Sequence, residues 1–235
     1  MADKPRECRA RVTRVRSLAA EILEADLQME EPPALSFEAG QWVSVPFGPK
    51  LVRAYSIAST PDRPSLITLC ADVAPGGIGS RWFKSLGPGT PLTFKGPLGG
   101  FVFKRDDPRQ PLFVAEEIGI VPIRSIIMTL SQRRFDCPTM LVYWARNPDW
   151  LAYHEEFLSL SRGEASFTYC PVVGEASAGW IGETGPLVAA VERHAPRVDA
   201  LVTYVAGGEE VIHRVRDVLT SRGLDRKAVK WEKFW

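Results

Sequence analysis

The sequence predicts two domains, an antiparallel β-barrel or sandwich followed by an α/β domain with an open, doubly wound parallel sheet. The first hundred residues alternate short apolar runs with turn residues, which is typical of antiparallel strands. After Pro111 longer apolar runs alternate with helical segments, which is typical of a parallel sheet. The charged, proline-containing stretch Lys104 to Pro111 separates the two patterns, so we place the domains at residues 1–108 and 109–235.

The strands of the first half are expected where apolar residues recur between turns. A helix is expected from about Gly79 to Leu86, after a glycine-rich turn. The four expected strand segments read RARVTRV, GQWVSVPF, LVRAYSIAS and LITLCADV.

The second half contains four apolar strand segments of the kind that parallel sheets bury on both faces. They read PLFVAE, TMLVYWA, ASFTYCPVV and ALVTYVAG. Helical segments such as PIRSIIMTLSQRR and EEVIHRVRDVLTSRG lie between or after them.

The charge composition limits the kinds of molecule that the protein is expected to bind. The 29 basic and 28 acidic side chains nearly cancel, so neither nucleic acid nor an anionic membrane is indicated as the main partner, and a small molecule or a protein is favoured. The N-terminus lacks an apolar signal segment, and no stretch approaches the roughly 20 apolar residues of a membrane span. We therefore expect a soluble cytoplasmic protein.

The four cysteines do not indicate a metal site. They are far apart, with no CxxC pair that could hold zinc or an iron-sulfur cluster, and reduced thiols are the ordinary expectation. They are Cys8, Cys70, Cys137 and Cys170.

Two neighbouring segments of the first half carry groups suited to an anionic ligand. On the strand Arg53 to Thr60, Arg53 and Tyr55 face one side and Ser56 the other. The later segment APGGIGSRW combines glycines that free the backbone with Ser80, which could cap the following helix. Unpaired amides at a helix start bind anions, although hairpin turns use the same residues.

With these motifs in this order, the sequence resembles the ferredoxin-NADP reductase superfamily of flavoproteins, in which an R-x-Y-S strand and a G-x-x-S turn bind FAD. The resemblance implies that the first domain is a six-stranded Greek-key barrel. It also implies that Arg53 pairs with the flavin pyrophosphate, Tyr55 lies against the isoalloxazine ring and Ser56 hydrogen-bonds near flavin N5. The other implied FAD contacts are Ala54, Leu69, Cys70, Ala71, Gly77, Ile78, Gly79 and Ser80.

The C-terminal WEKFW is similar to the closing E-x-aromatic motif of the same superfamily, especially of bacterial members. By that likeness Phe234 stacks on the exposed flavin face, Trp235 extends over the adenine side, and Glu232 is a proton donor or relay near N5. A nicotinamide would replace Phe234 on the flavin, and Ser56 and Glu232 would assist hydride transfer.

The loop that meets NAD(P)H in this superfamily reads approximately G-G-T-G-I-A-P, whereas here Glu116 and Glu117 replace the leading glycines. Carboxylates near a diphosphate repel it, so they predict weakened nucleotide binding unless they turn to solvent or pair with Arg124 or another cation. Alternatively, they stabilise the first turn of a helix. Both interpretations stay open. The remaining candidate nucleotide contacts are Gly119, Ile120, Pro122, Arg146 and Gly207, with Tyr153 as a further adenosine contact.

The leading hypothesis is an FAD-dependent oxidoreductase that passes electrons between NAD(P)H and a separate one-electron carrier such as ferredoxin or flavodoxin. The alternative is an FAD-binding electron-transfer or regulatory subunit that has lost NAD(P)H binding because of Glu116 and Glu117. A basic docking patch on the first strand is a further possibility, formed by Arg9, Arg11, Arg14 and Arg16.

Overall fold

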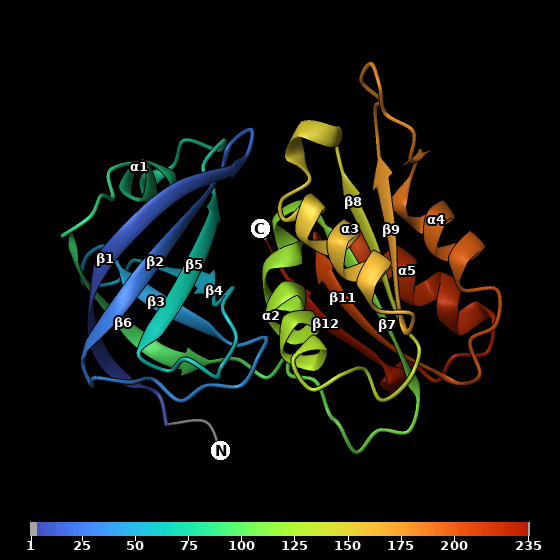
Figure 1. Ribbon diagram of the computed structural model, residues 1–235, viewed down its shortest axis with the longest axis horizontal. Helices are drawn as coiled ribbons and strands as arrows, with labels where there is room; N and C mark the ends of the chain where they lie inside the picture. Colours follow the sequence, from blue (N-terminus) through green and yellow to red (C-terminus); the bar gives the residue numbers. More distant parts are fainter. Residues whose placement is uncertain (1–3, 235) are drawn as a thin grey trace. The chain divides into compact units, whose positions relative to one another are not determined.

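The computed structural model describes residues 4–234 and divides into two compact units. The first unit comprises the described residues through Phe103 together with Arg124–Gln132, and the second comprises Lys104–Ile123 and the described residues from Arg133 onward. The predicted fold class is confirmed: one six-stranded sheet is antiparallel, and the other is parallel and flanked by helices (Figure 1).

The sheet of the first unit closes into a barrel. Its strand order is β4-β3-β6-β1-β2-β5, and a bridge between Ile57 and Leu69 joins the two ends. The amide of Ala58 also donates to the carbonyl of Thr68 at 2.8 Å. The strands are β1 (Arg6–Ala19), β2 (Ile22–Glu31), β3 (Trp42–Pro46), β4 (Val52–Ser56), β5 (Leu66–Asp72) and β6 (Pro91–Leu98), with helix α1 (Ile78–Lys84) between β5 and β6.

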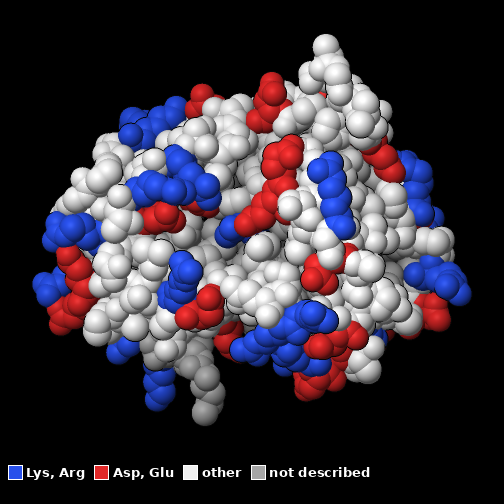
Figure 2. Space-filling view, viewed as in Figure 1, with Lys and Arg blue, Asp and Glu red and all other residues white. Residues whose placement is uncertain are grey.

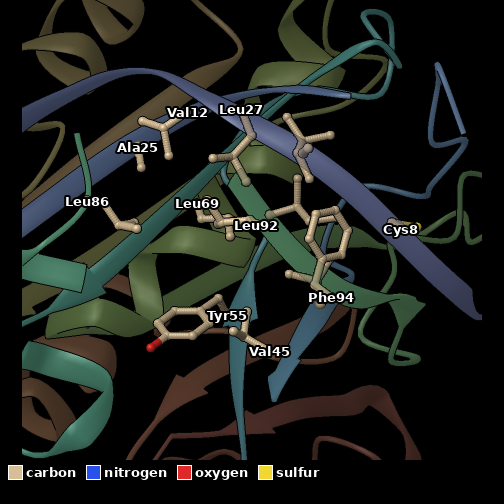
Figure 3. Close-up of a cluster of buried hydrophobic side chains, with 14 of the residues drawn as sticks. Cys8, Val12, Ala25, Leu27, Val45, Tyr55, Leu69, Leu86, Leu92 and Phe94 are labelled. Carbon is tan, nitrogen blue, oxygen red and sulfur yellow. The ribbon is translucent and has the colours of Figure 1, made fainter. Parts of the chain in front are cut away.

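The barrel encloses one apolar core. Alternate side chains of each strand point inward, so residues such as Val12, Leu27, Leu69 and Phe94 are almost fully buried (Figure 3). Phe83 of α1 belongs to the same cluster. Tyr55 of β4 and Leu69 of β5 also belong to it, so burial of this core fixes the three elements that carry most of the expected flavin contacts in the barrel.

The arginines of β1 do not form a net basic strip. Four of them have a carboxylate partner on the antiparallel neighbour β2, because outward positions of the two strands lie side by side. On the face shown in Figure 2, basic and acidic side chains are interspersed. The geometry therefore does not favour the docking patch suggested by the sequence. The pairs are Arg9–Glu31, Arg11–Glu30 at 2.7 Å, Arg14–Asp26 at 3.4 Å and Arg16–Glu24 at 2.5 Å.

The sheet of the second unit is parallel, with strand order β10-β9-β8-β7-β11-β12. From β7 the chain first proceeds outward through β8 and β9, and then returns to β11 on the other side of β7. The strands are β7 (Gln110–Glu116), β8 (Thr139–Ala145), β9 (Phe167–Val173), β10 (Glu183–Thr184), β11 (Leu201–Gly207) and β12 (Val229–Lys233). The helices that follow β7 in the chain are α2 (Ile120–Ser131), of which only the start belongs to this unit, α3 (His154–Gly163), α4 (Leu187–His194) and α5 (Glu209–Ser221).

Helices cover both faces of this sheet because its strands are apolar on both sides. Leu112 and Val114 belong to the cluster that includes Val191 of α4 and Val215 of α5. On the opposite face, Phe157 of α3 packs against Tyr169, with ring centroids 5.4 Å apart. This arrangement gives near-continuous apolar strands, which is the pattern that predicted the sheet.

Several boundaries differ from those expected. Helix α1 begins at Ile78 and ends at Lys84, one residue before and two residues before the expected limits. The C-terminal tail contains the edge strand β12, which pairs with β11. Its isolated apolar residues gave no alternating run from which a strand could be predicted. The division at 108/109 stays a prediction.

None of the helices in the described part of the chain combines the length and apolar character needed to cross a bilayer. Within residues 4–234, the four cysteines form no disulfide, and no group of three or more His, Cys, Asp or Glu side chains is placed to hold a metal ion.

A close approach fixes the start of α2 against the end of β11, and it yields a first prediction. A Cβ atom on Gly119 would lie 2.2 Å from the carbonyl oxygen of Ala206. Because backbone atoms cannot yield as a flexible side chain can, Gly119→Ala should destabilise the protein by about 2–4 kcal/mol. Urea unfolding measures the change.

Gly163→Ala is the matched control, because a Cβ there would meet nothing within 4 Å and the residue ends helix α3. It should be neutral or stabilise by up to about 1 kcal/mol. Equal effects of the two substitutions would contradict this description of the α2–β11 contact.

Candidate functional site

In the first unit the structure brings together three segments that are separate in the sequence. Strand β4 carries Arg53 and Ser56, the bridge from Ile57 to Leu69 places β5 beside it, and the turn into α1 lies against β4 at Gly79. The segments expected to contact FAD are therefore neighbours in the folded barrel, although whether each residue touches the cofactor stays a prediction.

Two polar groups of β4 are available to a ligand. The exposed Arg53 side chain donates to the carbonyl of Val52 at 2.9 Å and has no carboxylate partner among residues 4–234. Ser56 is buried at 6% exposure, and its hydroxyl makes no hydrogen bond within the same described chain. An arginine without an internal counter-ion suits a diphosphate, and a hydroxyl without a partner suits a ring nitrogen or carbonyl of a ligand.

The Tyr55 side chain packs against two aromatic rings of α1, a contact that the sequence did not predict. Its ring lies in the barrel core (Figure 3), 5.4 Å from the ring of Trp82 and 5.6 Å from that of Phe83, measured between centroids. Burial raises the pKa of the Tyr55 hydroxyl to about 12, and the neighbouring Arg53 offsets only part of that effect. Sequence reasoning missed Trp82, and the aromatic pair Trp82-Phe83 at the start of a predicted helix was the available signal.

The glycine turn is built for a close approach. A Cβ on Gly79 would lie 2.8 Å from the Tyr55 hydroxyl oxygen and 3.4 Å from Cγ of Arg53. The expected capping role of Ser80 is wrong, because the helix begins at Ile78 and Gly77 is the N-cap residue, without a side-chain cap. Ser80 is the third helical residue and is buried. The serine lies one turn too far into the helix to cap it.

These residues fit FAD. Arg53 supplies a cation without a carboxylate partner among residues 4–234, and Gly79 lets the turn before α1 approach Arg53 and Tyr55 closely. Ser56, on the other side of β4, supplies a buried hydroxyl. Of the other expected contacts, Leu69 and Ala71 are buried in the barrel core, and Cys70 is buried on the alternate side of β5.

Arg53→Gln should weaken FAD binding by about 10- to 100-fold, since a hydrogen bond to a charged group contributes roughly 1.5–3 kcal/mol. Lys95→Gln, which removes an exposed cation on β6, should leave FAD affinity within about twofold. Fluorescence titration of the apoprotein with FAD measures both. Unchanged affinity in the Arg53 variant would show that the diphosphate lies elsewhere.

In the second unit the candidate nucleotide contacts gather at the carboxyl ends of the parallel strands. The chain reverses direction between β7 and β11, and open parallel sheets bind nucleotides in the crevice at such a reversal. Gly119 follows β7, Arg146 follows β8 and Gly207 ends β11. Ile120 and Pro122 lie in the first turn of α2, where proline requires no hydrogen-bond donor.

Glu117 is paired inside the chain. Its carboxylate accepts from Nε of Arg146 at 2.7 Å and from Nη2 at 2.6 Å, and Arg146 also lies over the Trp150 ring, 3.8 Å from its centroid. The alternative in which a glutamate pairs with a cation therefore holds for Glu117, with Arg146 as the cation, whereas Arg124 donates to the carbonyl of Ala58 at 2.7 Å. Trp150 was missed because nothing in ARNPDW indicates which aromatic ring an arginine will contact.

Glu116 caps a helix, although not the one that follows it in sequence. Its Oε2 accepts from the amide of Gly208, the N-cap residue of α5, at 2.8 Å, while the turn Glu117–Gly119 receives no side-chain cap. A Cβ on Gly207 would lie 2.8 Å from Cβ of Glu116. Burial raises the pKa of Glu116 more than the Gly208 amide lowers it. The glutamate therefore spans the crevice between β7 and β11.

The C-terminal motif ends beside the same crevice. Glu232 of β12 pairs in register with Ala206, and the amide of Phe234 donates to the carbonyl of Gly207 at 2.9 Å. Oε2 of Glu232 is buried without a hydrogen-bond partner among residues 4–234, and burial raises its pKa to about 7. A carboxyl group with this pKa can donate or accept a proton near neutral pH. Trp235 lies outside the described residues.

Glu232 should make stability depend on pH. Because its folded-state pKa of about 7 exceeds the ordinary 4.5, the unfolded chain loses the proton first, and stability falls as the pH rises between these values. At pH 8 Glu232→Gln should be more stable than the wild type by up to about 3 kcal/mol, and the difference should shrink below pH 5. Denaturant unfolding from pH 5 to 8.5 measures it.

The control is Glu175→Gln, at an exposed position, which should retain the pH dependence of the wild type. A difference between Glu232→Gln and the wild type that stays constant across the pH range would contradict the raised pKa.

Comparisons with known proteins match both units. Residues 9–103 match the family model described as the oxidoreductase FAD-binding domain, and residues 113–217 match the oxidoreductase NAD-binding domain. The two matches lie on the barrel and on the parallel sheet, the units in which the two sets of residues were found.

Individual relatives agree. Ferredoxin-NADP reductase B of Sorangium cellulosum is 29% identical over 96% of this chain and 96% of its own length. The reductase component of propane 2-monooxygenase from Rhodococcus jostii is 25% identical over 97% of this chain but only 64% of its own length. The structure of a cytochrome P450 reductase from Amycolatopsis has the same fold, with a TM-score of 0.89, 24% identity and coverage of 98% of this chain and 70% of that one.

Proposed function

The chain belongs to the ferredoxin-NADP reductase superfamily, and from this premise we propose that it is an FAD-dependent oxidoreductase that passes electrons from NAD(P)H to a separate one-electron carrier. The observation that carries the proposal is the close approach of Gly79 to Arg53 and Tyr55 of β4, in a barrel that matches an FAD-binding domain. FAD, when bound, supplies the conversion between two-electron and one-electron transfer.

The residues of the chain would bind and orient the reactants. Arg53 would hold the diphosphate, and Tyr55, fixed by Trp82 and Phe83, would provide a rigid surface for the cofactor. The hydroxyl of Ser56 would donate a hydrogen bond to the reacting ring, and Glu232 would hold or release a proton near neutral pH.

A ferredoxin or flavodoxin is the proposed electron acceptor. Relatives named as a ferredoxin reductase and as the reductase component of an oxygenase support this partner class. The paired arginines of β1 do not support a basic docking strip, so recognition of the carrier would use another surface. We retain residues 1–108 and 109–235 as the proposed domains, and a cytoplasmic location as part of the proposal.

One observation favours the alternative of an FAD-binding electron-transfer or regulatory subunit that has lost NAD(P)H binding. Glu116 occupies the amide of Gly208 at the start of α5, in the crevice where a nucleotide would bind. Under this alternative the protein binds FAD, but neither nicotinamide nucleotide reduces it.

Anaerobic addition of NADH and of NADPH to the FAD-loaded protein separates the two functions. We expect rapid loss of the flavin absorption band, and we expect Ser56→Ala to slow it on the order of 10- to 100-fold while FAD stays bound. Ser17→Ala, an exposed serine at the end of β1, should reduce at the wild-type rate. A flavin that dithionite reduces but both nucleotides leave oxidised would establish the alternative.

A further inference from the structure

We propose that Ser125 and Arg124 of α2 are positioning residues for the flavin site, because they fix the backbone segment that directly follows Ser56. The inference rests on the proposed function, since it concerns how the Ser56 hydroxyl is held toward the reacting ring. It adds a role for two side chains of a helix that none of the expected FAD contacts includes.

The chain changes its strand partner directly after Ser56. Strand β4 pairs with β3 up to this residue, which lies opposite Trp42. The amide of Ile57 still donates to the carbonyl of Gln41 at 2.9 Å, but Ile57 forms its bridge with Leu69 of β5. Residues 58–65 belong to no strand, so strand pairing alone does not fix the backbone beyond this point.

Two neighbouring side chains of α2 hold this segment. The hydroxyl of Ser125 donates to the carbonyl of Ser59 at 2.7 Å, and Nη1 of Arg124 donates to the carbonyl of Ala58, also at 2.7 Å. The part of α2 that carries them belongs to the first unit, together with the barrel. The helix therefore supplies donors to two carbonyls that lie beyond the end of β4.

Strand β5 holds the same two residues through other atoms. The amide of Ala58 donates to the carbonyl of Thr68 at 2.8 Å, and the amide of Thr68 donates to Oγ of Ser59 at 3.0 Å. Ala58 and Ser59 thus each have one hydrogen-bond partner on β5 and one on α2. The bonds to α2 complete a set of contacts that restricts the backbone to one position.

The hydroxyl of Ser125 lies where water cannot replace it. The residue has an exposed fraction of 0%, whereas Arg124 is partly exposed. A buried polar group that loses its partner retains the full cost of its desolvation, so the backbone around Ser59 would shift toward another donor. Removal of the Ser125 hydroxyl should therefore displace the segment more than removal of the Arg124 guanidinium.

A displacement at Ala58 affects Ser56 because alternate residues of an extended chain lie on the same face. The Ser56 side chain is buried, and its hydroxyl has no hydrogen-bond partner among residues 4–234, so the backbone sets where it lies. A displacement of about 1 Å at a reacting group can lower a rate about 100-fold. Ser125 can therefore influence flavin reduction without touching the flavin.

The first test is stopped-flow reduction of the FAD-loaded protein at saturating NADH and at saturating NADPH. Ser125→Ala should slow reduction about tenfold, while the dissociation constants of FAD and of the nucleotide change by less than about threefold. Adding Ser125→Ala to Ser56→Ala should slow reduction by less than about twofold further, because Ser125 acts through Ser56.

Ser131→Ala is the matched control. It makes the same change on the same helix, but the Ser131 hydroxyl donates to the carbonyl of Met128, within α2, at 2.9 Å. This variant should be reduced at the wild-type rate.

A second pair of variants keeps the inference testable if Ser125→Ala does not fold. Arg124→Met, which removes the donor to Ala58, should slow reduction about threefold. Arg124→Lys keeps a donor at this position and should stay near the wild-type rate. Equal rates in these two variants would contradict the role of Arg124.

The visible circular dichroism of the bound FAD gives a readout that needs no nucleotide. Ser125→Ala and Ser56→Ala should change this spectrum in the same direction, and Ser131→Ala should leave it unchanged. A wild-type rate and spectrum in Ser125→Ala overturn the inference. So does a double variant whose loss of rate equals the product of the two single losses, since Ser125 would then not act through Ser56.

The two readouts separate the inference from the proposed function. If a nicotinamide nucleotide reduces the wild type, but Ser125→Ala keeps the wild-type rate and spectrum, the inference fails while the proposed function stands. If neither nucleotide reduces the wild type, but Ser125→Ala changes the flavin spectrum as Ser56→Ala does, the proposed function fails while the positioning role stands.

Discussion

The contact between the carboxylate of Glu117 and the guanidinium of Arg146 is the interaction on which the nucleotide side of this protein depends. It neutralises the one cation of the adjoining described loops and fixes the turn after β7 to the end of β8. Glu116 makes the complementary connection to the start of α5. The two glutamates thus bind the guanidinium of Arg146 and the backbone amide of Gly208, two groups that suit an anionic ligand. Both groups are paired within the protein before any nucleotide binds.

The two units present opposite electrostatic arrangements. On the barrel, Arg53 has no internal counter-ion among residues 4–234 and the hydroxyl of Ser56 has no partner there, so binding a diphosphate cofactor displaces no existing pair. On the parallel sheet, the corresponding groups are already paired. A resident cofactor benefits from an open, preorganised site, whereas a substrate that must leave after each turnover benefits from a site that does not bind it tightly.

The fold could be predicted because it depends on local periodicity. Alternating apolar residues gave the barrel strands, and continuous apolar runs such as PLFVAE gave the parallel strands. The motif resemblance then identified Arg53, Tyr55 and Gly79, which the structure brings together. Partners distant in sequence could not be predicted in the same way, since Glu116 contacts an amide 92 residues later and Glu117 an arginine 29 residues later. Only the folded sheet determines which strand ends are neighbours.

Two predictions failed because each considered one segment alone, whereas the result depends on how that segment packs or pairs in the fold. Ser80 has the chemistry of a capping residue, but packing of Phe83 into the barrel core accompanies a helix start at Ile78, which leaves Gly77 as the N-cap. Arginines of β1 were a candidate basic surface, but carboxylates of β2 form ion pairs with four of them. The acidic residues of ILEADLQMEE were the available signal. They indicate ion pairs with β1 only once the pairing of the two strands is known.

A double-mutant cycle on the free energy of unfolding tests the central interaction most directly. It compares the wild type with Glu117→Gln, Arg146→Met and the double variant, all FAD-loaded and without nucleotide. A bidentate pair whose carboxylate is buried predicts a favourable coupling energy of about 1–3 kcal/mol. A coupling energy near zero would show that Glu117 does not hold Arg146 in solution, and would contradict the account of an internally neutralised nucleotide site.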